Sequence, residues 1–173
     1  TPAGERVERM TGKPYDGLDR LRLTEEDFRD IRDVQPFLFT SDQLFLYQTR
    51  FKGEETVDGL ACWVLQIEPR QILEGQRLFE GFLWVNQSDY AVIQMEGRAV
   101  PQMLGKKENL FPRFRTVRKL VDGKHWFPHR TVGDEVLHFR GGSIRQRMEI
   151  EYSGYQRFGA ESTIRFEKDP PKQ

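Results

Sequence analysis

The chain has 173 residues, a size typical of a single domain that buries roughly two thirds of its unfolded surface. Its formal net charge is zero, which argues against nucleic acid or an anionic membrane surface as its partner. A single cysteine excludes an internal disulfide, and no apolar stretch reaches the roughly 18 residues that a membrane-spanning helix requires. We therefore expect one domain, residues 1–173, that binds no nucleic acid and is not membrane-spanning.

Apolar side chains are scarce but large. Hydrophobic residues make up 37% of the chain and charged residues 31%, and the aromatic residues include 13 Phe, 5 Tyr and 3 Trp. This composition favours a thin, aromatic-rich core on one face of a sheet whose other face meets water. Acidic residues dominate positions 1–97 and basic residues positions 98–147. Either the two regions compensate each other within the fold, or the basic band meets an acidic partner or lipid headgroups.

Residues 1–40 are expected to form a polar lead-in followed by one helix. Thr24 precedes three acids, which is typical of a helix N-cap with acids in the first turn, and Pro36 should end the helix. Between them, apolar residues recur at helical spacing: Phe28, Ile31 and Val34. The pattern predicts a helix over Glu25 to Asp33 whose apolar stripe docks on a sheet. Because the chain begins with Thr1-Pro2 rather than Met, we expect a processed or truncated product.

From Leu44 onward, strand-like runs alternate with short polar turns, which predicts an antiparallel meander over residues 44–158 and a tail over 159–173. The expected strands are Leu44 to Gly53, Leu60 to Pro69, Leu78 to Val85, Tyr90 to Val100, Phe111 to Val121, His125 to Val132, Val136 to Arg140 and Ser143 to Tyr152. The fold class is therefore mainly β: an antiparallel curved sheet or incomplete β-barrel of about eight or more strands, with one or two helices on its concave face.

The alternation of side chains predicts which faces are buried. Near the end of the sheet, Ile144, Met148, Ile150 and Tyr152 share one face, whereas charged residues occupy the other. The Leu60 to Pro69 run is apolar on both faces, so we expect cover on both sides. At Asp122-Gly123, a two-residue loop would place Arg115 opposite Arg130, so we expect a three-residue loop with a bulge at Gly123.

Enzyme signatures are missing from the sequence, which carries no nucleophile elbow, phosphate loop, dinucleotide turn or zinc-protease helix. We assign no catalytic residue, no cofactor and no metal site. His125 and His129 share a strand face but are separated by roughly 13 Å along an extended chain, which is too far to chelate one ion by themselves. Cys62 lies in an apolar run and is expected to be a small buried hydrophobe rather than a nucleophile.

The chain instead offers an apolar concavity as a candidate ligand site. Two arginines share strand faces with apolar residues, and they either orient the polar head of a ligand or pack their stems and extend to water: Arg118 and Arg130. The residues expected to line the concavity are Trp63, Leu65, Ile67, Leu83, Val85, Ile93, Met95 and Phe114.

Several segments between Tyr47 and Phe158 resemble the outer-membrane lipoprotein-sorting (LolA/LolB-like) family of Gram-negative envelope proteins, within an uncharacterised bacterial branch. They are GEETVDGLACWVLQIEPR, FEGFLWVNQSDYAVIQMEGRAVP, ENLFPRFRTVRKLVDGKHWFPHRT and IRQRMEIEYSGYQRFG. The resemblance implies an incomplete antiparallel barrel wrapped around lid helices. The chain departs from the family pattern because it has only one predicted helix, whereas the family's lid uses more. No ligand-binding residue of the family can be matched to a position in this sequence.

The resemblance also implies a function and a compartment. The expected function is non-catalytic binding of a lipid or lipoprotein acyl chain, as a periplasmic or outer-membrane-associated carrier or sensor. A first alternative is a cell-envelope protein–protein interaction module with a filled core, and a second is an enzyme of unknown type.

Overall fold

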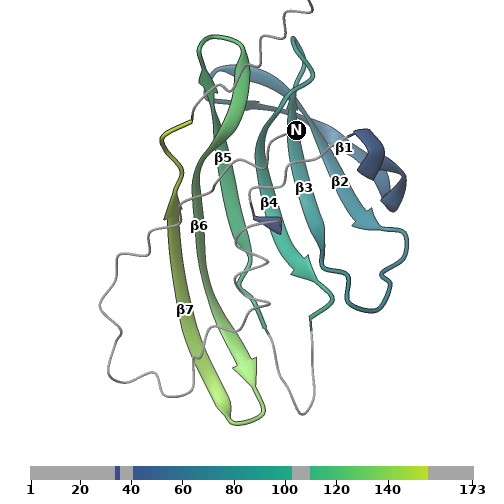
Figure 1. Ribbon diagram of the computed structural model, residues 1–173, viewed down its shortest axis with the longest axis vertical. Helices are drawn as coiled ribbons and strands as arrows, with labels where there is room; N and C mark the ends of the chain where they lie inside the picture. Colours follow the sequence, from purple (N-terminus) through teal and green to yellow (C-terminus); the bar gives the residue numbers. More distant parts are fainter. Residues whose placement is uncertain (1–33, 36–40, 103–109, 156–173) are drawn as a thin grey trace, which may run out of the picture.

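The computed structural model describes residues 34–35, 41–102 and 110–155, and this part of the chain forms one open antiparallel sheet. A 3-10 helix, η2 (Ser41–Leu46), leads into the first strand. It is the only helical element among the described residues. The strands are β1 (Tyr47–Val57), β2 (Leu60–Pro69), β3 (Leu78–Asn86), β4 (Val92–Val100), β5 (Phe114–Val121), β6 (His125–Phe139) and β7 (Gly142–Glu151). Figure 1 shows them side by side in chain order, from β1 in blue to β7 in yellow-green.

The predicted antiparallel meander is confirmed, because every neighbouring pair of strands runs antiparallel in the order β1 to β7. The sheet does not close, since β1 and β7 are its two edges. The predicted start at Leu44 was wrong, because Ser41–Leu46 forms η2 before β1 begins. The predicted helix over Glu25 to Asp33 lies outside the described residues.

The described sheet has seven strands rather than eight, because two predicted strands are one. The sequence patterns predict that one strand ends at Val132 and that the next begins at Val136. In the structure, the three residues between them are part of β6, which runs without a break for fifteen residues: Gly133, Asp134 and Glu135. A Cβ on Gly133 would lie 2.8 Å from the carbonyl oxygen of Arg113, so this glycine permits a close approach within a strand. Asp134 is held by a cross-strand pair with Arg145 (2.7 Å).

The hairpin between β5 and β6 has the predicted three-residue loop. Val121 pairs with His125, and Gly123 takes a left-handed conformation with φ of +65°. A second irregularity between Val117 and Arg118 leaves His129 as an extra residue. The two together place Arg115 opposite Val132, so the predicted avoidance of the Arg115–Arg130 pair is confirmed.

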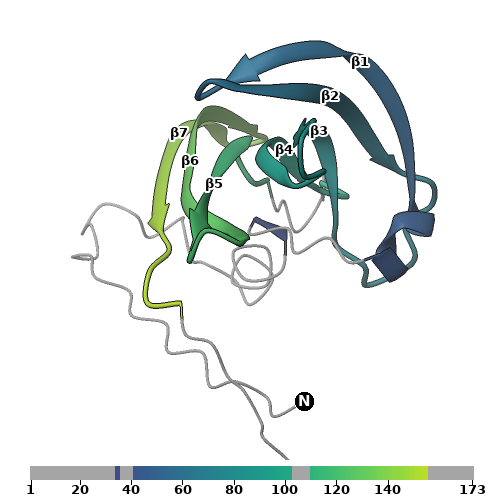
Figure 2. The same cartoon turned by 90° about the horizontal axis from the view of Figure 1, so that it is seen from above.

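The two faces of the sheet carry different cores. We call the face that contacts Val34 the inner face and the opposite face the outer face; Figure 2 shows the sheet bending around the short segment 34–35. The inner cluster consists of Val34, Tyr47, Ile67, Phe79, Leu83, Val85, Met95, Ala99 and Phe114. A smaller outer cluster consists of Cys62, Val64, Trp84 and Ile93, so β2 is covered on both sides as predicted.

A pair of glycines brings β3 and β4 close together at the centre of the inner face. Gly81 lies directly opposite Gly97, and the ring of Phe79 lies over both. A Cβ on Gly97 would lie 2.6 Å from that ring and 2.8 Å from the Cα of Gly81. Phe79 also packs against Phe114, with ring centroids 5.8 Å apart. The glycines therefore create the space that the central aromatic side chain of the core fills.

Candidate functional site

The structure brings most of the predicted concavity residues together on the inner face. Six of them lie in the inner cluster or pack against it beside Phe114: Trp63, Leu65, Ile67, Leu83, Val85 and Met95. Ile93 is the exception and packs in the outer cluster. Gln94 pairs with Trp84 and Val92 with Val85, so Ile93 is an extra residue that turns to the other face.

Along one row of the inner face, the apolar surface runs from full burial to open exposure. The register places Phe51, Leu65, Leu83 and Met95 side by side on β1 to β4. Met95 and Leu83 are 0% and 3% exposed, Leu65 is half-buried, and Phe51 is 61% exposed. The apolar side chains thus continue past the packed core toward the β1 edge, where they are accessible.

An aromatic pair extends this accessible region along the next row. The rings of Trp63 and Tyr90 lie 5.7 Å apart, and Tyr90 is 72% exposed. Tyr90 has φ of +61°, which is rare for an aromatic residue. The turn maintains this conformation, because the Tyr90 N–H donates to the carbonyl of Asn86 (3.0 Å) and the Ala91 N–H to the carboxylate of Asp89 (3.1 Å). We call Phe51, Trp63, Leu65 and Tyr90 the aromatic shelf.

The centre of the inner face toward β5 and β6 is polar and filled. The hydroxyls of Thr116 and Thr131 lie 2.6 Å apart, and both residues are fully buried. The Thr116 hydroxyl donates to the backbone carbonyl of Gln35 (2.9 Å), and the Gln35 amide lies 3.3 Å from the sulfur of Met148. Thr131 also lies 3.1 Å from the hydroxyl of Tyr152. This network ties the segment 34–35 to the sheet.

Arg118 lies on the inner face, on the same side of β5 as Phe114 and Thr116. It comes one residue after Val117, which forms the last β4–β5 pair with Gln94, and it lies opposite Pro128 of β6. Burial lowers the pKa of its guanidinium below the usual value, and the nearby Tyr155 opposes that shift. Arg118 is therefore a partly desolvated cation on β5.

Arg130 does not join Arg118, and its predicted position on the concave face was wrong. It neighbours the inward Thr131 and lies on the outer face, where its Nε donates to Glu149 Oε1 (2.9 Å). The extra residue at His129 accounts for this placement, because it shifts the alternation of β6 by one position. Arg130 instead follows the second interpretation given for it above: its guanidinium extends toward water and pairs with a carboxylate, that of Glu149.

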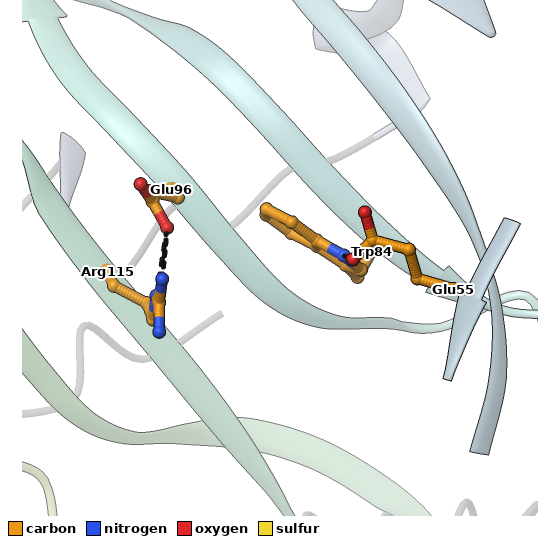
Figure 3. A network of polar contacts seen from close by, with 4 residues as sticks. All are labelled: Glu55, Trp84, Glu96 and Arg115. Carbon is orange, nitrogen blue, oxygen red and sulfur yellow. Dashed lines mark hydrogen bonds and ion pairs between the residues drawn. The ribbon is translucent and has the colours of Figure 1, made fainter. Parts of the chain in front are cut away.

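A shallow depression of about 370 Å³ lies on the outer face between the bulge in β1 and strands β3 and β4. Trp84 forms part of its wall and donates from Nε1 to Glu55 (2.8 Å), while Arg115 donates to Glu96 (2.7 Å). Figure 3 shows Trp84 of β3 beside Glu55 of β1, and Glu96 of β4 beside Arg115 of the neighbouring strand β5. Because Glu55 and Glu96 already have partners on other strands, the depression is a junction of interstrand contacts, which the sequence patterns did not indicate.

The remaining polar residues give no sign of a metal centre. Among the described residues, no group of three or more His, Cys, Asp and Glu side chains is arranged to hold an ion. His138 contacts the hydroxyl of Ser143 (2.7 Å), and the His125 ring lies 6.1 Å from that of Phe127. Cys62 is fully buried, as predicted, and burial raises the pKa of its thiol, which disfavours the reactive thiolate.

Sequence patterns did not indicate Phe51, Tyr90 or the threonine pair. Phe51 becomes part of the shelf only through its register with Leu65. Tyr90 becomes part of it only because the turn after β3 brings its ring against that of Trp63. A usable signal was present in one case, because Thr116 shares its strand alternation with Phe114 and Arg118.

Comparisons with known proteins give no relative: no protein-family model, no curated protein and no solved structure matches the chain. Within the part of the chain that the structure describes, no helix has the length and apolar character needed to cross a membrane.

Proposed function

We propose that the protein binds an apolar ligand, a lipid or lipoprotein acyl chain, on the inner face of its open sheet. The observation that carries the proposal is the row from buried Met95 to exposed Phe51, which continues the core into accessible apolar surface. The resemblance to the lipoprotein-sorting family gives the proposed role, a non-catalytic carrier or sensor, and the proposed compartment, the periplasm or the outer membrane.

The energetics of an acyl chain suit such a surface. Burying each methylene gains roughly 0.8 kcal/mol, so a chain of about a dozen gains on the order of 10 kcal/mol before the costs of ordering. The aromatic shelf supplies rigid side chains with large apolar area, which lose little conformational entropy when they bind. In this proposal, Arg118 meets the polar head and Arg130 has no part.

The test is binding of a fluorescent single-chain fatty acid to the full chain. Phe51→Ser removes an exposed inner-face side chain, so it should weaken binding about tenfold or more without lowering the melting temperature. Val136→Ser is the matched control, because Val136 is 45% exposed and lies opposite Arg145 on the outer face. Equal affinity in both variants, or no binding up to about 100 µM, would contradict the proposal.

A second measurement tests the polar head. If Arg118 meets the head, the wild-type chain should bind a fatty acid more tightly than the fatty alcohol of equal length. Arg118→Met should abolish that preference while retaining affinity for the alcohol. Loss of affinity for both probes, together with a lower melting temperature, would instead assign Arg118 a structural role.

One observation favours the alternative of a cell-envelope interaction module. The segment 34–35 and the threonine pair fill the centre of the inner face. A ligand-free chain by native mass spectrometry after purification without detergent, with no fatty-acid binding, would support this second candidate.

A further inference from the structure

The two edges of the described sheet differ in their ability to accept another strand. The β1 ladder is interrupted between Phe51 and Gly53, where Lys52 is an extra residue, and bulges of this kind protect edges from pairing. The β6–β7 ladder has no interruption over its ten pairs, from Arg130–Glu151 to Phe139–Gly142. Strand β7 is the regular edge, at the left of the sheet in Figure 1.

The hydrogen-bond phase shows which residues of β7 face away from β6. The Tyr152 N–H donates to the carbonyl of His129 (2.9 Å), and hydrogen-bonded positions alternate along an antiparallel ladder. Even-numbered residues of β7 therefore bond to β6, and the backbone groups of odd-numbered residues point outward. Apart from Ser143 at the hairpin, these odd positions are all charged, and their side chains are exposed on the outer face: Arg145, Arg147, Glu149 and Glu151.

The order of these four charges is complementary to itself when the strand is reversed. In an antiparallel pair of β7 strands centred on Met148, Arg147 lies opposite Glu149 of the second copy, and Arg145 lies opposite Glu151. The two-fold symmetry repeats each pair, and opposite charges directly across two strands are stabilising. The backbone N–H and C=O groups of these four residues point away from β6, so they can form the hydrogen bonds of an antiparallel ladder with a second β7.

Neighbouring registers lack this match. Centring the pair on Arg147 places that arginine opposite its own copy, and centring it on Glu149 does the same with two carboxylates. Charges of one sign along an edge oppose pairing, whereas this sequence of two arginines followed by two glutamates selects one partner strand and one register.

The intrachain ion pairs leave room for these contacts. Both hydrogen bonds from Arg130 go to Oε1 of Glu149, so Oε2 can accept from Arg147 of a second copy. Arg145 donates from Nε and Nη2 to Asp134, which leaves its Nη1 for Glu151 of a second copy. The Glu149 side chain is 53% exposed and that of Arg145 is 72% exposed.

We propose that β7 is a homodimer interface, in which a second copy of this chain adds its own β7 antiparallel about Met148 and joins two sheets into one. The proposal does not depend on ligand binding by the inner face. It commits to one occupant of the edge, because the self-complementary charge order fits a second copy.

Sedimentation velocity of the full chain tests the assembly. The wild type should sediment at twice the chain mass of 20.4 kDa. Arg147→Glu and Glu149→Arg each place like charges across the two-fold axis, so each should raise the dimer dissociation constant at least tenfold. Mixing the two variants should restore a dimer, because positions 147 and 149 of one chain are then both acidic and lie opposite basic side chains of the other. Lys52→Glu on the bulged β1 edge is the control and should leave the dimer unchanged.

A backbone variant and hydrogen exchange cover the case in which Glu149→Arg does not fold. Arg147→Pro removes an outward N–H without breaking a bond to β6, so it should give a folded monomer. In the wild type, the amides of Arg145, Arg147 and Glu149 should exchange more slowly as protein concentration rises. A monomeric wild type would overturn the proposal, and slow exchange of those amides in that monomer would place another segment of the chain on the edge. Failure of folded charge variants to form a mixed dimer would overturn it as well.

Discussion

The inner and outer faces of this sheet are built from the same strands but held in different ways. On the inner face, an apolar cluster extends from Tyr47 to Phe114 and is joined by Val34, with the Gly81–Gly97 pair at its centre. On the outer face, the buried apolar side chains lie on β2–β4, with Val57 of β1 and Trp126 of β6 packed against them, and exposed ion pairs lie on β6 and β7. Close packing therefore holds the inner face together, whereas charged pairs between strands dominate the outer face at β6 and β7.

The largest effect should come from a substitution at the centre of the inner face. Gly97→Ala would place a Cβ 2.6 Å from the Phe79 ring and 2.8 Å from the Cα of Gly81. Because one of these neighbours is backbone, we expect a loss of about 3 kcal/mol or more in the free energy of unfolding. Urea denaturation followed by circular dichroism measures it.

Gly141→Ala is the control for that experiment. A Cβ at Gly141 meets no atom within 4 Å, so the free energy of unfolding should change by less than about 0.5 kcal/mol. Equal losses in the two variants would show that the close approach of β3 and β4 does not limit stability.

The buried threonine pair should give the next largest effect. Thr116→Val removes a hydroxyl that contacts Thr131 and donates to the Gln35 carbonyl, and both partners are buried, so we expect a loss of about 1–3 kcal/mol. In a double-mutant cycle with Thr131→Val, the two losses should not add, with an interaction energy of about 0.5 kcal/mol or more. Strict additivity would show that the two hydroxyls act independently.

The outer ion pairs should contribute much less. The Arg130 and Glu149 side chains are 50% and 53% exposed, and pairs of this kind typically contribute up to about 1 kcal/mol. We expect Arg130→Met to lower the free energy of unfolding by less than about 1 kcal/mol, with a smaller effect at high salt. If Arg130→Met lowered the free energy of unfolding as much as Thr116→Val does, the two faces would not differ in how much their polar contacts contribute to stability.

The smallest effect should appear on acidification. The Trp126 Nε1–H bond to Asp89 (2.8 Å) lowers the pKa of that carboxyl group below its usual value. A depressed folded-state pKa stabilises the fold above the unfolded value of about 3.9, and that contribution is lost as the pH falls below it. Since Asp89 is exposed, we expect a small downward slope of stability below about pH 4, which Asp89→Asn should remove; thermal melts from pH 3 to 6 measure it.

Local patterns were sufficient to place most strands. The turns at Asp58-Gly59 and Asp122-Gly123 have the left-handed conformations that such pairs favour, and the alternation from Ile144 to Ile150 gives the observed burial of β7. Turn chemistry and alternation are properties of a few consecutive residues, so the sequence is enough to read them. The same reasoning split β6 at Gly133, because a glycine that permits close packing has the same appearance in sequence as one that makes a turn.

The strand order, the hairpins and an apolar face that includes Trp63, Leu83 and Phe114 could all be predicted from sequence patterns. The faces of Ile93 and Arg130 could not, because the extra residues at Ile93 and His129 depend on how a strand fits its neighbour. An extra residue reverses the alternation for everything that follows it, and nothing within the strand itself records that change. For the same reason, the accessible shelf around Phe51 and the outward charges of β7 emerge only from the register of paired strands.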